Sequence, residues 1–146
     1  AVRFCFVNHK YIECFENIFA DIYVSVHRYE TGRIRNFAKF YAALLENDAL
    51  PWSIFELITI SDEETTSSGR IFLKFLFQEL VESMTVDRFQ QKIMDPSLVE
   101  FTRGLFPSGD LKTVRFSINF FTSIGLGILT MKMRKELKEL QEKALA

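Results

Sequence analysis

Apolar residues recur at intervals of three and four along most of the chain, which is the spacing of helices that bury one face. Near the start, one such face carries Tyr11, Phe15, Ile18, Ile22 and Val26. No strand-like alternation is long enough to predict a sheet. The chain is therefore predicted to be all-α, a stack of antiparallel helical hairpins with about seven to eight helices. The helices are expected over residues 9–28, 34–45, 51–58, from within 65–70 to 84, 86–94, 95–105, 110–124 and 130–146.

Two of these helices stand out. The one that ends near residue 84 is apolar most of the way round, with Phe72 and Leu76 on one side and Phe77 and Met84 on another. A helix of that kind is surrounded by others, so it is expected at the centre of the domain. The last helix, 130–146, is rich in Lys and Glu and has only a narrow apolar stripe, so it is expected to be partly exposed.

The composition of the chain excludes several classes of protein. A chain of 146 residues with 48% hydrophobic and 25% charged residues fits one globular domain over 1–146 and excludes a disordered chain. Its 16 phenylalanines need deep burial, which indicates core packing rather than catalysis. A net charge of −1 excludes a global field that would draw the domain to nucleic acid or a membrane. The uncharged stretch 116–131 is too short to cross a bilayer, so no membrane partner is expected.

Candidate chemistry is sparse. Cys5 and Cys14 are separated by roughly 13 Å if they share one helix, too far for a disulfide, and they are expected to be buried free thiols. His9 and His27 show no metal-ligand spacing with them, and no nucleophile or phosphate-binding motif occurs. We therefore expect no catalytic residue, no metal and no cofactor, and the chain is not predicted to be an enzyme.

The charges cancel overall but are segregated along the chain. Residues 40–69 contain six acids and no Lys or Arg, and a basic segment precedes them. Two interpretations stay open: a solvated rim whose loop carboxylates serve helix N-termini, or a docking surface with acidic and basic parts that steers a partner. The basic patch, a candidate site for RNA or an acidic partner, consists of Arg28, Arg33, Arg35 and Lys39.

The segment Leu50-Pro51-Trp52-Ser53 places the only tryptophan of the chain at a loop-to-helix junction inside the acidic segment. Tryptophan is enriched at interface hot spots. It is also suited to fill a groove between two hairpins. Both interpretations of Trp52 stay open.

Several blocks of sequence resemble a known family. They are LPWS at 50–53, ETTSSGRIF at 64–72 and RFSINFFTSIGLG at 115–127, with shorter matches at 35–39 and 75–80. Across roughly residues 3–140, the chain resembles the MA3 domain of the MIF4G/MA3 family of pre-mRNA splicing factors. Residues 84–95 and those after 130 follow the family less closely, and Ile128 stands where a small residue is expected.

The resemblance implies a HEAT-like, protein-binding stack of hairpins in a nuclear protein, of which this chain would be a fragment. The module would support splicing and exon junction complex deposition by docking on the U5 core and its protein Prp8, near the 5′ exon of the pre-mRNA. The exon-junction helicase, initiation factor 4A-III, would be bound mainly by a MIF4G domain absent from this chain.

The alternative is an MA3 domain that directly binds and regulates a 4A-type DEAD-box RNA helicase. In helicase-binding members of the family, acidic residues near hairpin loops make much of the contact. The candidate partner-binding residues are Asp48, Glu56 and Asp110, by similarity of position, together with Trp52.

Overall fold

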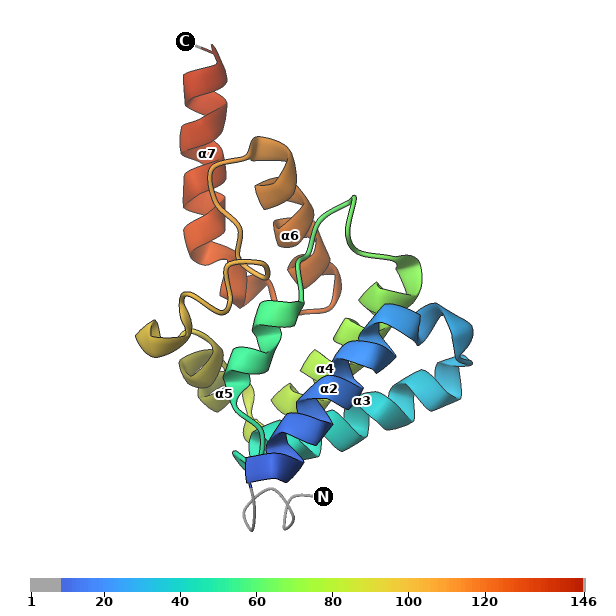
Figure 1. Cartoon of the computed structure of the whole chain (residues 1–146). Coiled ribbons are helices and arrows are strands. Elements are labelled where there is room, and N and C mark those ends of the chain that lie inside the picture. The colour runs from blue at the N-terminus through green and yellow to red at the C-terminus, as the bar shows by residue number, and fades with distance from the viewer. Residues whose placement is uncertain (1–8, 146) are drawn as a thin grey trace. The chain divides into compact units, whose positions relative to one another are not determined.

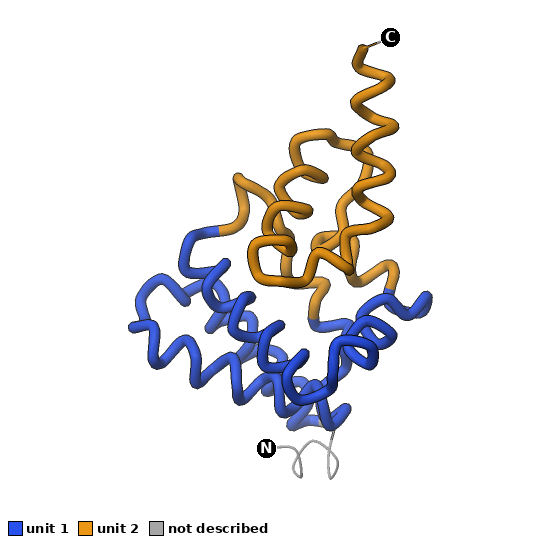
Figure 2. Tube along the Cα trace, turned by 180° about the vertical axis from the view of Figure 1, so that it is seen from behind, with its two compact units in different colours: residues 1–54, 66–98 blue, residues 55–65, 99–146 orange. Residues whose placement is uncertain are grey.

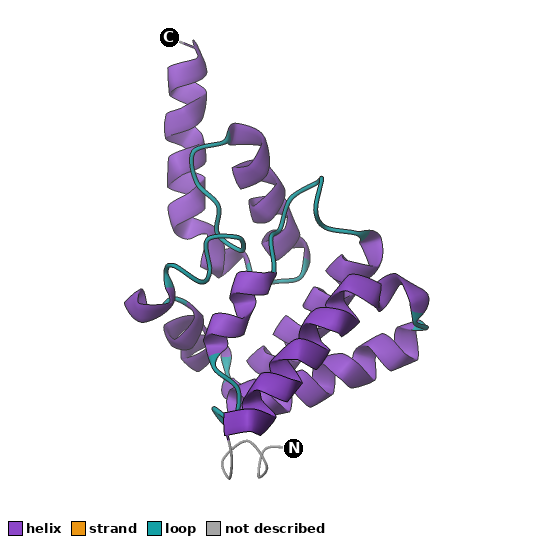
Figure 3. Cartoon of the chain, viewed as in Figure 1, coloured by secondary structure: helices purple, strands orange, loops and turns teal. Residues whose placement is uncertain are grey.

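The computed structural model describes residues 9–145, apart from the side chain of His9. Over this range the chain forms helices joined by turns and loops, without a strand, which confirms the all-α prediction (Figures 1 and 3). None of the helices in the described range is long and apolar enough to cross a membrane. The α-helices are α2 (His9–Ser25), α3 (Thr31–Glu46), α4 (Ser67–Met84), α5 (Val86–Ile93), α6 (Leu111–Ser123) and α7 (Met131–Leu145). The 3-10 helices are η1 (Val26–Arg28), η2 (Trp52–Leu57), η3 (Pro96–Leu98) and η4 (Gly127–Thr130).

The chain divides into two compact units, and neither is continuous in sequence (Figure 2). Within the described range, unit 1 takes residues 9–54 and 66–98, and unit 2 takes residues 55–65 and 99–145. The chain therefore leaves unit 1 after Ile54 and re-enters it at Thr66. One domain over 1–146 stays a prediction.

In unit 1, α2 and α3 form the hairpin expected from the sequence. The hydroxyl of Tyr41 on α3 donates to the carbonyl of Phe15 on α2 at 2.9 Å, and the ring of Tyr41 meets that of Phe19 edge-on at 5.0 Å. The buried residues of α2 are Phe19 and Ile22 in its second half, and Val26 continues this face on η1. Tyr11 and Ile18, which the sequence pattern placed on the buried stripe, are 42% and 46% exposed.

The structure tests the prediction of buried free thiols for one of the two cysteines. Cys14 is a free cysteine on α2 but is exposed rather than buried, so the prediction of a buried thiol is wrong for it. Cys5 lies outside the described residues.

Helices α3 and α4 run in the same direction. The guanidinium of Arg35 lies over the ring of Phe75 at 4.7 Å, and the ammonium of Lys39 lies 4.0 Å from the carboxylate of Glu79. From the first contact to the second, the residue number rises by four on both helices. The helices are therefore parallel. Parallel neighbours cannot be joined by a tight turn, and here the long connection 47–66 carries the chain back.

Helix α4 is the centre of unit 1, as the sequence predicts. Its Phe72 ring contacts Phe19 at 5.8 Å, and its Phe77 ring contacts Phe89 of α5 at 5.9 Å. Phe72 and Phe77 are fully buried, while Ile71 is 37% exposed on the opposite side of the helix. The helix begins where the Thr66 hydroxyl accepts from the backbone N–H of Gly69 at 2.9 Å. It ends at Thr85, whose φ of 73° turns the chain directly into α5.

In the described part of unit 2, α6 buries more side chains than any other helix. Val114, Ile118 and Phe121 are buried on it, and the Ser117 hydroxyl donates to the carbonyl of Leu105 at 2.6 Å. Gly125, at φ +84°, ends the helix where the sequence predicted a stop, because this left-handed conformation suits a residue without a Cβ. Helix α7 is exposed over most of its length and buries Met133, and Ile128 before it is 47% exposed.

The expected helix over residues 95–105 is wrong. Only Pro96–Leu98 forms one turn of 3-10 helix, and turns follow. Gly104 explains why: its carbonyl accepts from the N–H of Ile60 at 2.8 Å, and a Cβ on it would lie 2.2 Å from the carbonyl oxygen of Ile58. The segment is shaped by this contact with residues 58–60, which lie far away in the sequence.

Candidate protein-binding surfaces

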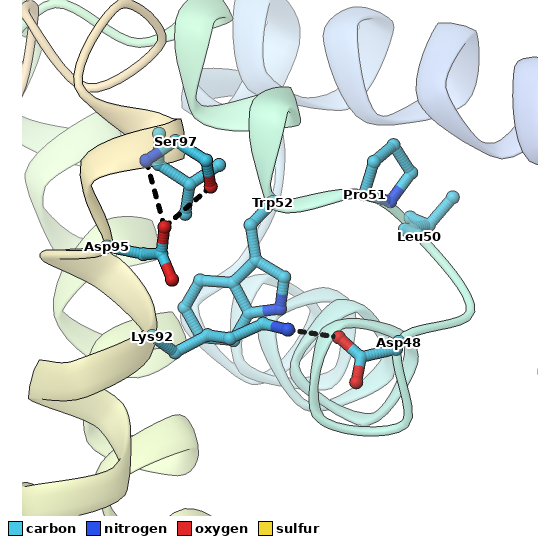
Figure 4. Close-up of a pocket in the computed structure, with 8 residues that line it drawn as sticks. Asp48, Leu50, Pro51, Trp52, Lys92, Asp95 and Ser97 are labelled. Atoms are coloured by element: carbon cyan, nitrogen blue, oxygen red, sulfur yellow. Dashed lines mark hydrogen bonds and ion pairs between the residues drawn. The ribbon is translucent and has the colours of Figure 1, made fainter.

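Unit 1 contains a hollow of about 190 Å³ beside its only tryptophan, here called the Trp52 hollow (Figure 4). It lies where the C-terminal ends of α3 and α5 meet the start of η2 and η3. The residues that line it are Asp48, Leu50, Pro51, Trp52, Lys92, Asp95, Ser97 and Leu98.

The floor of the Trp52 hollow is rigid. Trp52 is only 3% exposed, its indole N–H donates to the carbonyl of Leu45 at 3.0 Å, and its ring lies 5.9 Å from that of Phe89. Leu50 beside it is fully buried. Of the two interpretations of Trp52, the structure favours packing, because the indole is an interior group that reaches the surface only through this hollow.

The rim of the Trp52 hollow carries two carboxylates and one ammonium. Asp48, in the left-handed conformation at φ 55°, binds the ammonium of Lys92 at 2.7 Å, and that ammonium lies 5.9 Å from the indole centroid. One oxygen of Asp95 accepts both from the hydroxyl of Ser97 at 2.6 Å and from its N–H at 2.8 Å. These hydrogen bonds, that of the hydroxyl first, lower the pKa of Asp95.

The basic patch lies in unit 1 on η1 and α3, and all four of its residues are exposed. The Arg35 guanidinium is stacked on Phe75, and that of Arg33 lies 5.7 Å from the ring centroid of Tyr29. Lys39 lies near Glu79, as described above. Arg28 is the last residue of η1. Most of the patch is therefore already held against rings or acids of its own unit.

The other two candidate residues lie in unit 2. Glu56 is an exposed residue of η2. Asp110 is the N-cap of α6: its carboxylate accepts from the N–H of Thr113 at 3.0 Å and also from the Thr113 hydroxyl. These bonds, the hydroxyl first, lower the pKa of Asp110. Asp110 thus has a structural role at the start of α6.

Loop carboxylates do not serve the start of α4, contrary to one part of the sequence interpretation. Thr66 caps this helix with its hydroxyl, and the hydroxyl of Thr65 joins the loop by accepting from the N–H of Ser61 at 3.0 Å and donating to the carbonyl of Thr59 at 3.0 Å. Asp62 instead lies 4.0 Å from Lys112. Hydroxyls on the two residues nearest the helix fit the tight turn, which leaves the acids in solvent.

The sequence interpretation missed half of the Trp52 hollow. It named Asp48 and Trp52 but not Lys92, Asp95 or Ser97. A signal was present in Asp95-Pro96-Ser97, where an aspartate before proline favours a turn that its own side chain can close. Because residues 95–105 are assigned to a helix in the sequence prediction, this turn is not predicted.

No group of three or more His, Cys, Asp or Glu residues within the described range is arranged to hold a metal ion. What the described surfaces offer instead is a charged hollow and a basic helix face, both suited to contacts with other macromolecules.

Comparison with known proteins gives a consistent result. No protein-family model matches the chain. Among curated proteins, the chain is 49% identical over 138 residues to the pre-mRNA-splicing factor CWC22 homolog of Xenopus laevis and 51% identical over 138 residues to that of Drosophila melanogaster. It is 44% identical over 135 residues to the pre-mRNA-splicing factor cwf22 of Schizosaccharomyces pombe.

These matches cover 94%, 94% and 92% of the chain but only 17%, 10% and 15% of the respective relatives. The chain therefore spans between a tenth and about a sixth of their length. Along almost its whole length, it is homologous to one segment of the CWC22 pre-mRNA-splicing factors.

Proposed function

We propose that the chain is an MA3-type protein-protein interaction module of a pre-mRNA-splicing factor, which acts in the nucleus by binding rather than by catalysis. The observation that carries this proposal is the 44% to 51% identity to splicing factors over nearly the whole chain. The all-α architecture of hairpins supports it, since exposed helix faces and hairpin ends are surfaces on which other proteins dock.

In its finer form, the proposal assigns the module a place on the U5 core, against Prp8 and near the 5′ exon of the pre-mRNA. There it supports splicing and the deposition of the exon junction complex. Binding of initiation factor 4A-III is assigned mainly to a MIF4G domain elsewhere in the longer protein.

Co-purification tests this proposal. An affinity-tagged chain is incubated with nuclear extract, and the bound proteins are quantified against an unrelated helical-hairpin protein of similar size and charge. We expect enrichment of U5 proteins, Prp8 among them, over that control. Recovery of spliceosomal proteins at the control level would overturn the proposal.

The alternative function is direct binding of a 4A-type DEAD-box helicase. It is favoured by one observation, the exposure of Asp48 after α3, Glu56 on η2 and Asp110 at the start of α6. The discriminating measurement uses the chain alone and a purified helicase. Under the alternative the two bind, and the charge reversals Asp48→Lys and Glu56→Lys weaken binding; no binding of the wild-type chain rejects it.

The basic patch offers a further contact with RNA or an acidic partner. Because phosphate neutralisation releases counterions, RNA affinity through Arg28, Arg33, Arg35 and Lys39 would fall steeply with salt. We expect weak binding in isolation, since two of these side chains already stack on rings of unit 1. A titration with single-stranded RNA at two salt concentrations measures it.

A further inference from the structure

We propose that the Trp52 hollow receives one arginine side chain of a protein partner. This inference rests on the proposed function as a protein-binding module and names the ligand that one surface of the module takes.

The size of the hollow fits a single side chain. Its volume of about 190 Å³ corresponds to roughly six water molecules at the volume that each occupies in the liquid. That is room for one long, unbranched side chain. A whole helix does not fit in it, so the expected occupant is a residue that projects from a partner surface.

The floor of the hollow is suited to the apolar stem of that side chain, and the rim is suited to its charged end. The exposed Pro51, the half-buried Leu98 and the small exposed part of Trp52 provide apolar surface on which methylene groups can pack. Asp48 and Asp95 stand above it with Lys92, so the rim has an excess of one negative charge (two carboxylates against one ammonium). An apolar stem with a cationic end matches this arrangement.

Asp95 is the group that has capacity for a new cation. Asp48 already binds Lys92 at 2.7 Å. Both bonds from Ser97 go to one oxygen of Asp95, and in Figure 4 its second oxygen lies on the side of the carboxyl group that faces Trp52. A cation in the hollow would therefore meet a carboxylate that is ionised and already oriented.

Arginine fits better than lysine. A guanidinium is planar, stacks on aromatic rings and is more weakly hydrated than an ammonium, so it loses less on entering a narrow site beside an indole. It can bind the carboxylate of Asp95 through more than one N–H donor of its planar group, which a single ammonium does less well. A phosphate or an acidic side chain is excluded because it would face two carboxylates.

The hollow is also preorganised. Trp52 is fixed by its hydrogen bond to Leu45, Asp95 by Ser97, and Asp48 by Lys92. Binding then orders few side chains of this protein, which keeps the entropic cost of association low.

The experiment exploits the single tryptophan. The chain carries one indole N–H, that of Trp52, so one resonance in a nitrogen-15 correlation spectrum reports on the hollow. The probe is the peptide acetyl-Gly-Gly-Arg-Gly-Gly-amide, with two matched peptides in which citrulline or lysine replaces arginine. We expect a saturable shift of the Trp52 indole and of the Asp95 and Ser97 amides with arginine, a severalfold weaker response with lysine, and none with citrulline.

Substitutions in the hollow show which of its side chains bind the arginine peptide. Asp95→Asn keeps an oxygen that can accept from Ser97 but removes the charge, and should weaken peptide binding by about fivefold to tenfold. Asp87→Asn, at an exposed carboxylate in the first turn of α5, is the control and should leave binding unchanged. Lys92→Gln should strengthen binding severalfold, because it frees Asp48 and removes the competing ammonium.

Three results would overturn the inference: equal shifts with citrulline, equal effects of Asp95→Asn and Asp87→Asn, or weaker binding by Lys92→Gln. The opposite signs expected for the two hollow variants keep the test decisive even where one of them perturbs α5. The proposed function fails separately. If the wild-type chain recovers spliceosomal proteins but does not bind the arginine peptide, only the hollow is misassigned; if it binds the peptide but recovers no spliceosomal protein, only the function is.

Discussion

In unit 1, aromatic rings join helices that are far apart in the chain, whereas in unit 2 polar side chains tie irregular segments to the helices. Phe72 links α4 to α2 through Phe19, and Phe89 links α5 to both Phe77 and Trp52. Unit 2 has ring contacts as well, such as Phe106 with Phe121 at 5.2 Å. Its long-range hydrogen bonds are nevertheless what positions its loops.

The difference follows from how the backbone N–H and C=O groups of each unit find hydrogen-bond partners. A helix pairs its own N–H and C=O groups, so neighbouring helices need only matching apolar faces. Residues 55–65 and 99–110 contain little regular helix, and their buried polar groups require outside partners. In unit 2, the Ser117 hydroxyl donates to the carbonyl of Leu105 and the Ile60 N–H donates to the carbonyl of Gly104. At an exposed turn, the Gly109 N–H donates to the carboxylate of Glu136 at 2.6 Å.

The largest effect is expected in the aromatic core of unit 1. Phe72→Ala removes a fully buried ring that contacts Phe19 and Tyr23, and should lower the free energy of unfolding by about 3–5 kcal/mol. Ile71→Ala, on the exposed side of the same helix, should cost far less. Denaturant unfolding followed by Trp52 fluorescence, which reports on unit 1, and by far-UV circular dichroism, which reports on both units, measures it. Coincident transitions would support one cooperative domain over the chain and contradict separate units.

In unit 2, the strongest effect is expected from backbone crowding. Gly104→Ala places a Cβ 2.2 Å from the carbonyl oxygen of Ile58, so the segment must move and lose the Ile60 hydrogen bond. We expect a loss of about 3 kcal/mol, from overpacking and the broken bond together. The matched control is Gly32→Ala, where a Cβ on α3 meets nothing within 4 Å and should stabilise by up to about 1 kcal/mol. Thermal unfolding of both variants checks the opposite signs, and equal shifts would refute this explanation of the non-helical segment.

A smaller effect tests whether single polar bonds hold the loops of unit 2. Ser117→Ala leaves the carbonyl of Leu105 without the hydroxyl that donates to it in a buried position, at a cost of about 1–2 kcal/mol. Ser123→Ala removes a bond to the carbonyl of Phe120 within the same helix, at an exposed residue, and should be close to neutral. Chemical denaturation compares the two. Similar small losses would mean that apolar packing, and not the Ser117 bond, positions residues 99–110.

The smallest effect is electrostatic and depends on pH. Folding lowers the pKa of Asp110, so its contribution to stability is fully present above the unfolded pKa, about 4, and is lost as the pH falls through the lower folded pKa. Asp110→Asn keeps a capping oxygen without the charge. The midpoint of thermal unfolding should therefore be slightly lower than that of the wild type at pH 7, and the gap should narrow as the pH is lowered below about 4. A gap that is constant with pH would assign the role of Asp110 to geometry alone.

Local signals predicted most of the helices. The Thr66, Thr85 and Asp110 caps and the stop at Gly125 act within a few residues, and each helix end lies close to its expected place. The expected helix over 95–105 failed because its conformation depends on the contact between Gly104 and residues 58–60. No local pattern contains such a contact.

The candidate site could also be predicted only in part, because local patterns do not show contacts between distant residues. Charge segregation and the lone tryptophan singled out Asp48 and Trp52. The cation that binds Asp48 comes from Lys92, more than forty residues later, rather than from the basic segment next to it. The hollow exists only because α5 returns to the end of α3, and a pattern of single residues cannot show that return.

The interrupted course of the chain has a consequence for its synthesis. Unit 1 has all its residues once Leu98 has left the ribosome, but by then residues 55–65 have already been made and their neighbours in unit 2 have not. At a few to about twenty residues per second, the roughly fifty residues that complete unit 2 take several seconds. During that interval residues 58–60 lack their backbone contacts with Gly104, so Ile58 and Ile60, which are fully buried in the folded chain, stay exposed on the nascent chain.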